Sequence, residues 1–227
     1  MSNSYFRFKQ FTIHQEQCAM KVGTDGTLLG AWAQGGERIL DIGTGTGLIA
    51  LMMAQRFPQA QVVGIDIDGL ACKQALENVA ASPFQNRVQI SHLSLQDYTD
   101  EGFDSIVSNP PFFVQSLSCP DEQRTTARHA GSLTYADLFQ GVVRLLHEDG
   151  VFSAVIPLEC RDAFDAEAIL HGLCPVAECA VKTSLRKQPK RFLLSYRKKP
   201  SSCYVRDVLT IGSEAYVDLM KDFYLSY

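Results

Sequence analysis

The feature that most constrains this fold is a regular alternation of short apolar strands with helices. Strands alternating with helices form a parallel sheet that helices cover on both faces. Strands are predicted at 38–43, 61–66, 87–93, 103–109 and 151–157, and helices at 48–57, 69–82, 133–150 and around 164–170. Two more strands, at 176–184 and 191–199, have no helix between them. The sequence therefore predicts a seven-stranded, mostly parallel α/β sheet that an antiparallel hairpin closes at one edge.

The chain has 227 residues, a length that suits one large α/β domain. We expect a catalytic core at 34–200, an N-terminal extension at 1–33 and a C-terminal strand and helix appendage at 201–227. In the predicted helix at 69–82, apolar residues recur at helical spacing and should face the core. They are Leu70, Cys72, Ala75, Leu76 and Val79.

Composition excludes several classes of protein. The N-terminal "MSNSYFRFKQ" does not resemble a signal peptide, and the longest apolar runs are too short to span a bilayer. The seven cysteines are scattered without a CxxC pair, which argues against a disulfide framework or a zinc site. We therefore expect a cytoplasmic protein with no metal, no membrane association and no obligate protein partner.

The segment "DIGTGTG" joins the first strand of the core to its first helix. Gly43, Gly45 and Gly47 allow the backbone to turn tightly and to approach a ligand closely. A helix that begins directly afterwards offers unpaired N–H groups to that ligand. A loop of this kind predicts a cofactor that carries adenosine, although the glycine pattern alone is a weak signal.

Three acidic residues sharpen this prediction. Asp41 precedes the glycines, where it would repel a pyrophosphate but attract a cationic cofactor. Asp66 ends the second strand, where a carboxylate can accept the ribose hydroxyls, and Asp68 is the alternative for this role. Asp97 follows the third strand, near the expected adenine edge. An acidic pocket without a phosphate-binding group predicts S-adenosylmethionine, whose methionine end carries a sulfonium and an ammonium.

The segment "SNPPFF" follows the fourth strand. Asn109 offers a side-chain oxygen and Pro110 a backbone carbonyl, and the Pro110–Pro111 pair fixes the direction of that carbonyl. Two acceptors on the N–H bonds of an aromatic amino group would stabilise the charge that develops during methyl transfer. Phe112 would stack on the base, which must be unpaired or flipped out, whereas Phe113 is expected to pack in the core. We predict a catalytic segment, with Asn109 also in contact with the donor; an ordinary turn is the structural alternative.

A basic stretch, "SLRKQPKRFLLSYRKKP", spans residues 184–200 and contains no acid, although the whole chain has a net charge of −4. A basic patch on an acidic protein predicts contact with nucleic-acid phosphates, but a solvated hairpin would look the same. The candidate RNA-binding residues are Arg186, Lys187, Lys190, Arg191, Lys198 and Lys199, together with Arg124 and Arg128 in the loop that follows "SNPPFF".

The combination of DxGxGxG, an acid after the second strand and Asn-Pro-Pro-Phe after the fourth resembles class I S-adenosylmethionine-dependent methyltransferases that act on exocyclic or amide nitrogens. In addition, "FKQFTIHQEQCAMKVGTDGTLLGAWA" (8–33) and "DFYL" (222–225) resemble the bacterial tRNA1(Val) (adenine-37-N(6))-methyltransferases. This resemblance implies methylation of the adenine beside the anticodon in tRNA. It also implies that the segment containing Lys21, Thr24, Asp25 and Leu28 helps to wall the cofactor pocket.

The residues alone leave the acceptor open. Methylation of a protein glutamine amide, or of guanine N(2) in ribosomal RNA, also requires two acceptors and a flat stacking surface. A non-catalytic RNA-binding protein could retain the same shell. The basic stretch and the lack of a separate target-recognition domain favour RNA as the substrate.

Overall fold

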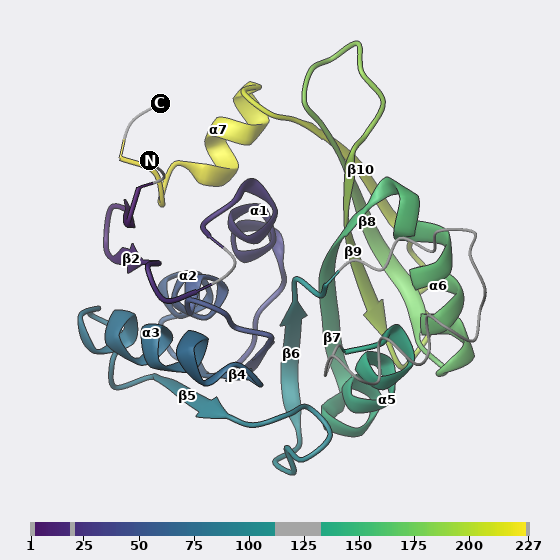
Figure 1. Ribbon diagram of the computed structural model, residues 1–227. Helices are drawn as coiled ribbons and strands as arrows, with labels where there is room; N and C mark the ends of the chain where they lie inside the picture. The colour runs from purple at the N-terminus through teal and green to yellow at the C-terminus, as the bar shows by residue number, and fades with distance from the viewer. Residues whose placement is uncertain (1–2, 19–20, 112–132, 226–227) are drawn as a thin grey trace, which may run out of the picture.

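The computed structural model describes residues 3–18, 21–111 and 133–225, and an eight-stranded sheet with helices on both faces lies at its centre (Figure 1). The strands are β1 (Tyr5–Arg7), β2 (Thr12–His14), β3 (Arg38–Ile42), β4 (Gln61–Asp66), β5 (Val88–His92), β6 (Phe103–Ser108), β7 (Leu146–Pro157), β8 (Cys174–Lys182), β9 (Arg191–Arg197) and β10 (Val205–Thr210). The helices are α1 (Thr24–Trp32), α2 (Leu48–Arg56), α3 (Gly69–Ala80), α5 (Tyr135–Leu145), the 3-10 turn η1 (Leu158–Cys160), α6 (Arg161–Leu170) and α7 (Glu214–Met220).

The strand order in the main sheet is β10-β8-β9-β7-β6-β3-β4-β5. Strands β5, β4, β3, β6 and β7 run parallel, whereas β9 lies between β7 and β8 and is antiparallel to both. The predicted fold class and the antiparallel hairpin are thus confirmed. The predicted number of strands was wrong, because β10 adds an eighth strand that pairs in parallel with β8. A separate two-stranded sheet, β1–β2, lies in the N-terminal segment.

Two element-level predictions were wrong in detail. Helix α5 ends at Leu145, and β7 begins at Leu146 rather than after Gly150, because the Leu146 side chain is buried beside β6. In α3, Cys72, Ala75 and Val79 are buried as predicted, but Leu70 and Leu76 are exposed, and the buried face also carries Gln74 and Asn78. Those two amides bond the backbone of the N-terminal segment, so tertiary contacts rather than apolar spacing decide which face is buried.

Alternating side chains of the strands divide the core into two clusters. One cluster contains Ile39 and Val107 and packs under α1 and α2, whereas the other contains Leu40 and Ile106 and packs under α5 and α6. Each face of the sheet is therefore covered, as a parallel sheet requires.

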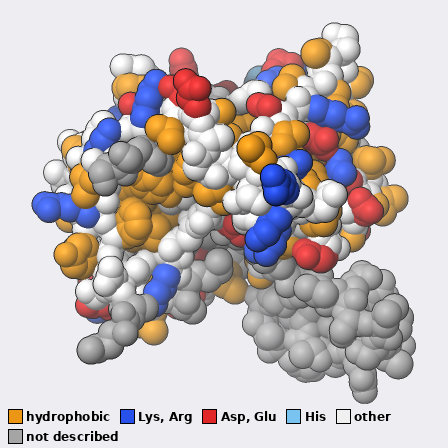
Figure 2. All heavy atoms as spheres, turned by 90° about the horizontal axis from the view of Figure 1, so that it is seen from above, with side chains coloured by type: hydrophobic (Ala, Val, Ile, Leu, Met, Phe, Trp, Pro, Cys, Tyr) orange, Lys and Arg blue, Asp and Glu red, His pale blue; other side chains and the backbone are white. Residues whose placement is uncertain are grey.

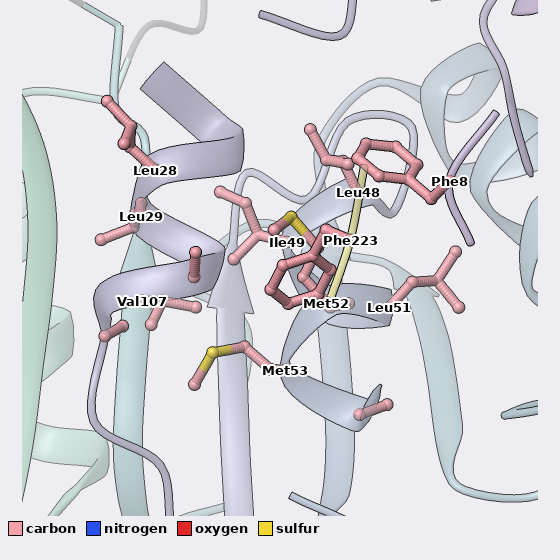
Figure 3. Close-up of a cluster of buried hydrophobic side chains, with 14 of the residues drawn as sticks. Phe8, Leu28, Leu29, Leu48, Ile49, Leu51, Met52, Met53, Val107 and Phe223 are labelled. Atoms are coloured by element: carbon pink, nitrogen blue, oxygen red, sulfur yellow. The ribbon is translucent and has the colours of Figure 1, made fainter. Parts of the chain in front are cut away.

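The two terminal segments meet on the outer side of α2. Phe223 is buried and lies close to Phe8, Leu48 and Met52 (Figure 3). The Lys9 N–H donates to the Phe223 carbonyl at 2.8 Å, and the Tyr224 hydroxyl bonds Thr27 Oγ1 at 3.1 Å. The segments around 8 and 223 therefore hold each other, and α1, against the sheet.

None of the helices in the described part of the chain is long and apolar enough to cross a membrane. The described residues also contain no group of side chains arranged to hold a metal ion. No disulfide joins the six cysteines that fall in the described ranges.

Candidate active site

The register of the parallel strands brings the sequence motifs together at the carboxyl ends of the strands, which we call the active-site edge of the sheet. Ile42 of β3 pairs with Ile65 of β4 on one side and with Ser108 of β6 on the other. The residues that follow, Gly43, Asp66 and Asn109, therefore leave three adjacent strands side by side. Strand order reverses between β3 and β6, and ligands bind at such a switch point outside the carboxyl ends of the strands.

The glycine loop between β3 and α2 has a conformation that glycine favours. Gly43, Gly45 and Gly47 have φ angles of 71°, 55° and 80°. The N–H groups of Gly43 and Thr44 both donate to the Ile65 carbonyl, at 2.9 and 3.0 Å. Apart from Gly43 and its two chain neighbours, no atom of the described residues lies within 4 Å of the place where a side chain on Gly43 would begin, so a ligand can approach the backbone there.

Asp41 is completely buried beneath this loop. Its Oδ2 accepts from Thr44 Oγ1 at 2.7 Å and from the Ala50 N–H of α2 at 3.1 Å. Its Oδ1 has no partner among the described residues. Burial raises the pKa of Asp41 to about 7, and nearby Asp66 adds to this shift. Asp41 therefore braces the loop and keeps one oxygen available.

Asp66 and Asp68 have different roles. The carboxylate of Asp66 accepts from the Gly45 N–H at 2.8 Å and from the Asp68 N–H at 3.0 Å, so it lies directly beside the glycine loop. Asp68 caps α3 and accepts from the Leu70 N–H at 2.8 Å. Asp66 bonds the glycine loop and Asp68 bonds only α3, so Asp66 is the better-placed candidate for the ribose.

Asp97 lies five residues beyond the end of β5, and β5 is the neighbour of β4. Its side chain is exposed and accepts a hydrogen bond from Ser94 Oγ at 2.7 Å. The predicted adenine contact thus comes from the same edge of the sheet as Asp66, one strand further out.

Asn109 combines burial with an unused hydrogen-bonding atom. Ser108 Oγ donates to the Ile42 carbonyl at 2.9 Å, which ties the end of β6 to the end of β3. Directly afterwards, the Asn109 Oδ1 atom is buried and has no partner among the described residues. Pro110 is buried and Pro111 is exposed. A buried polar atom without a partner is costly, and a ligand amino group would satisfy it.

Three of the predicted site residues, Phe112, Arg124 and Arg128, lie outside the described residues, as does Phe113.

The N-terminal segment reaches the glycine loop at Cys18. Cys18 Sγ lies 3.8 Å from the place where a side chain on Gly45 would begin. Lys21 and Thr24 are exposed, and Leu28 is buried in the core. Asp25 forms an ion pair with Arg191, with 2.7 Å between Oδ2 and Nε.

The basic stretch divides into two parts on opposite edges of the sheet. Arg191 pairs with Pro157, the last residue of β7, so the turn between β8 and β9 projects from the active-site edge (Figure 1). Arg186, Lys187 and Lys190 are exposed in this turn, and none forms an ion pair within the described ranges. At the other end of β9, Lys198 and Lys199 pair with Glu148 and Asp149, at 3.2 and 2.8 Å. Seen from the side toward which β6 points, basic side chains lie beside a recess with apolar walls (Figure 2).

Sequence reasoning did not single out Asn78. This residue is buried on α3 and bonds both β2 and the glycine loop. The signal available in the sequence was a polar residue on the face of a helix that is expected to be buried. Buried amides have hydrogen-bond partners, so such a residue indicates a specific contact.

The order of the strands, together with the glycine loop, Asp66 and Asn109 at their carboxyl ends, is that of a class I methyltransferase fold. A predicted O-methyltransferase from Agrobacterium tumefaciens has the same fold, with a TM-score of 0.62 and 18% identity, over 88% of this chain and 94% of that one. The TYW2 structure from Pyrococcus horikoshii, a complex with MeSAdo, has a TM-score of 0.60 and 13% identity, over 86% and 71% of the two chains. These similarities concern the fold alone.

Sequence comparison is more specific. The family model described as "Methyltransferase small domain" matches residues 26–157. Proteins named tRNA1(Val) (adenine(37)-N6)-methyltransferase are similar over nearly the full length of both chains. The relative from Bacteroides thetaiotaomicron is 47% identical over 99% of each chain, and the one from Haemophilus influenzae is 40% identical over 99% and 100%. The chain therefore belongs to the family of tRNA1(Val) (adenine(37)-N6)-methyltransferases.

The cofactor prediction, S-adenosylmethionine, is confirmed by this family of methyltransferases. The residues present fit such a group. The space above Gly43 accommodates a ligand close to the backbone, and Asp66 is placed for a ribose. The free oxygen of Asp41 adds negative potential where a cationic end would lie.

Proposed function

We propose that this protein methylates N6 of adenine 37 in the anticodon loop of tRNA1(Val). The relatives carry that activity in their names, which favours it over the guanine and glutamine-amide alternatives. The observation in this chain that supports the proposal most strongly is the buried Asn109 Oδ1, which lacks a partner among the described residues and lies beside the glycine loop.

The chemistry requires positioning rather than a strong base. S-adenosylmethionine supplies an electrophilic methyl group, and the adenine amino group is a weak nucleophile because its lone pair is delocalised into the ring. Asn109 Oδ1 and the Pro110 carbonyl would accept the two N–H bonds of that amino group. These contacts draw the nitrogen toward tetrahedral geometry and stabilise its developing positive charge. Phe112 would hold the flipped base by stacking.

For the donor, we assign Asp41, Gly43, Gly45, Gly47, Asp66 and Asp97, with Lys21 and Thr24 in the adjoining wall. Asp66 would hold the ribose and Asp97 the adenine edge. Asp41 would counter the cationic end through its unpaired oxygen, in addition to its contacts with Thr44 and α2.

For the tRNA, we assign Arg186, Lys187 and Lys190, because they are exposed, lack ion pairs among the described residues and lie at the active-site edge. Arg191 pairs with Asp25, so we assign it a role in fixing this turn as well as in contacting RNA. Lys198 and Lys199 were also candidates, but their ion pairs and their place at the opposite edge favour a structural role. We further propose that the chain works in the cytoplasm, where tRNA is modified, and that residues 1–227 form a single domain.

The test is methyl transfer from labelled S-adenosylmethionine to a tRNA1(Val) transcript, followed by mass spectrometry of the nucleosides. We expect N6-methyladenosine at position 37 and none in a transcript with guanine at that position. Methylguanosine, or label in protein after nuclease treatment, would establish one of the alternative substrates instead.

A further inference from the structure

Asn78 lies on the buried face of α3 and forms three hydrogen bonds through the oxygen and the nitrogen of its side-chain amide. Its Oδ1 accepts from the His14 N–H at 2.8 Å, and its Nδ2 donates to the His14 carbonyl and to the Thr46 carbonyl, each at 2.9 Å. One side chain thus joins strand β2 of the N-terminal segment to the glycine loop.

The Thr46 carbonyl is a critical place for such a bond. Thr46 lies between Gly45 and Gly47, which have φ angles of 55° and 80°. Glycine adopts positive and negative φ about equally, so the peptide groups on both sides of Thr46 have little intrinsic preference for one orientation. The Gly47 N–H bonds the Thr44 carbonyl at 2.9 Å, and Asn78 holds the carbonyl of the same peptide group. Together these two bonds fix the plane of the Thr46–Gly47 peptide.

The remaining polar contacts of the loop come from β4 and from Asp41 of β3, whose carboxylate accepts from Thr44 Oγ1. Gly43 and Thr44 bond the Ile65 carbonyl, and Gly45 bonds the Asp66 carboxylate. Asn78 therefore anchors the part of the loop that leads into α2, whereas β4 anchors the part that leaves β3.

We propose that Asn78 is a positioning residue for the methyl donor: its amide fixes the Thr46 peptide, and so the shape of the glycine loop, against strand β2. Asn78 itself does not contact the donor. Without the Asn78 amide, the Thr46–Gly47 peptide adopts several orientations. Only a fraction of the molecules then has the glycine loop in the conformation that binds the donor. Apparent affinity falls by that fraction. The loss of the amide also leaves the Thr46 carbonyl and both His14 backbone groups unpaired.

The experiment is calorimetric titration of Asn78→Ala with S-adenosylhomocysteine, the demethylated donor, in the absence of RNA. We expect the Kd to rise roughly 10- to 100-fold, the range set by leaving buried backbone groups unpaired. In turnover assays, the KM for the donor should rise by a similar factor, while the KM for tRNA changes less than about two-fold. The titration needs no acceptor, so its result stands even if the proposed tRNA substrate is wrong.

Gln74→Ala is the matched control. Gln74 lies one turn earlier on the same buried face and accepts from the Gln17 N–H at 3.3 Å, without a bond to the glycine loop. We expect it to lower the Tm while leaving the Kd for S-adenosylhomocysteine within about two-fold of wild type. If Asn78→Ala does not fold, Asn78→Ser, which keeps a small polar group, is titrated instead. The proposal is overturned if a folded Asn78 variant binds S-adenosylhomocysteine as wild type does, or loses no more affinity than a Gln74→Ala protein of equal Tm.

Discussion

The two ends of the parallel strands differ in how many of their polar groups have hydrogen-bond or ion-pair partners. Where β3, β4 and β6 begin, several charges and backbone groups have partners: Arg38 pairs with Asp100 at 2.7 Å, and Asp104 accepts the N–H groups of Glu37 and Arg38. At the edge where these strands end, Asp41 Oδ1 and Asn109 Oδ1 are buried and unpartnered among the described residues. Exposed cations stand in the turn after β8.

This difference separates residues that stabilise the fold from residues that await a ligand. Folding alone favours pairing of buried polar atoms, because each unpaired one costs about 1–3 kcal/mol. Where a protein retains that cost at the switch point of a parallel sheet, binding a ligand can recover it.

The largest effect is expected from Asn109→Ala. Removing one of two acceptors for the developing charge should lower kcat by about 10²–10³-fold. The Kd for S-adenosylhomocysteine should stay within about three-fold, because the glycine loop and Asp66 are untouched. Single-turnover assays and calorimetry measure the two quantities. A variant that loses donor affinity in proportion to kcat would place Asn109 in cofactor binding rather than at the acceptor nitrogen.

The next largest effect concerns the turn between β8 and β9. Replacing Arg186, Lys187 and Lys190 together with Gln should weaken tRNA binding and lower the slope of log Kd against log salt concentration by about 2 to 3, close to one for each lost phosphate contact. Filter binding between 50 and 200 mM salt, about the range over which such slopes are read, measures this.

Lys198→Gln combined with Lys199→Gln is the matched control from the opposite edge. Both cations are already paired with carboxylates, and exposed pairs contribute only about 0–1 kcal/mol. tRNA affinity and its salt slope should change little. If this pair changes the slope as much as the turn does, RNA contacts both edges and the contrast between them fails.

The last prediction is a pH dependence of stability set by Asp41. Its pKa in the folded protein is about 7, above the value of 3.8 for an exposed carboxyl, because burial disfavours the charge. Between pH 3.8 and 7, Asp41 is therefore protonated in the native state and ionised in the unfolded state. Protonation of Asp41 favours the native state fully below pH 3.8, and this stabilisation disappears as the pH rises through 7. The free energy of unfolding should fall with a slope of up to about 1.4 kcal/mol per pH unit between pH 5 and 7. Urea titrations of wild type and Asp41→Asn compare the slopes, and equal slopes would show that Asp41 is ionised in the native state.

The sequence predicted the elements whose signals are local. The glycine loop, the acid after β4 and Asn-Pro-Pro after β6 were placed correctly at one edge, because parallel strands carry their carboxyl ends to the same side. A strand was predicted within 201–227, but its place in the main sheet beside β8 was not. Most residues of β10 are exposed, so no buried run indicates that it joins the sheet.

Other features depend on contacts between distant segments. Helix α1 contains Gly26 and Gly30, which lower helix propensity, yet they allow α2 to approach closely: a side chain on Gly30 would begin 2.8 Å from Met52 Sδ. The bonds of Asn78 join residues 64 and 32 positions away in the chain. The division of the basic stretch follows from the length of β9, which carries its two ends to opposite edges of the sheet. Local sequence patterns do not predict these contacts, because each one joins residues that are far apart in the chain.

The reversed direction of β9 has an evolutionary corollary. In a wholly parallel sheet, every loop at the ligand-binding edge leads into a helix, so lengthening one disturbs the packing of that helix. Because β9 is antiparallel to both β7 and β8, residues 183–190 form a turn between two paired strands and lead into no helix. Such a turn can differ in length and sequence between homologues without disturbing a helix. The choice of acceptor can then diverge while the donor-binding part of the sheet stays unchanged.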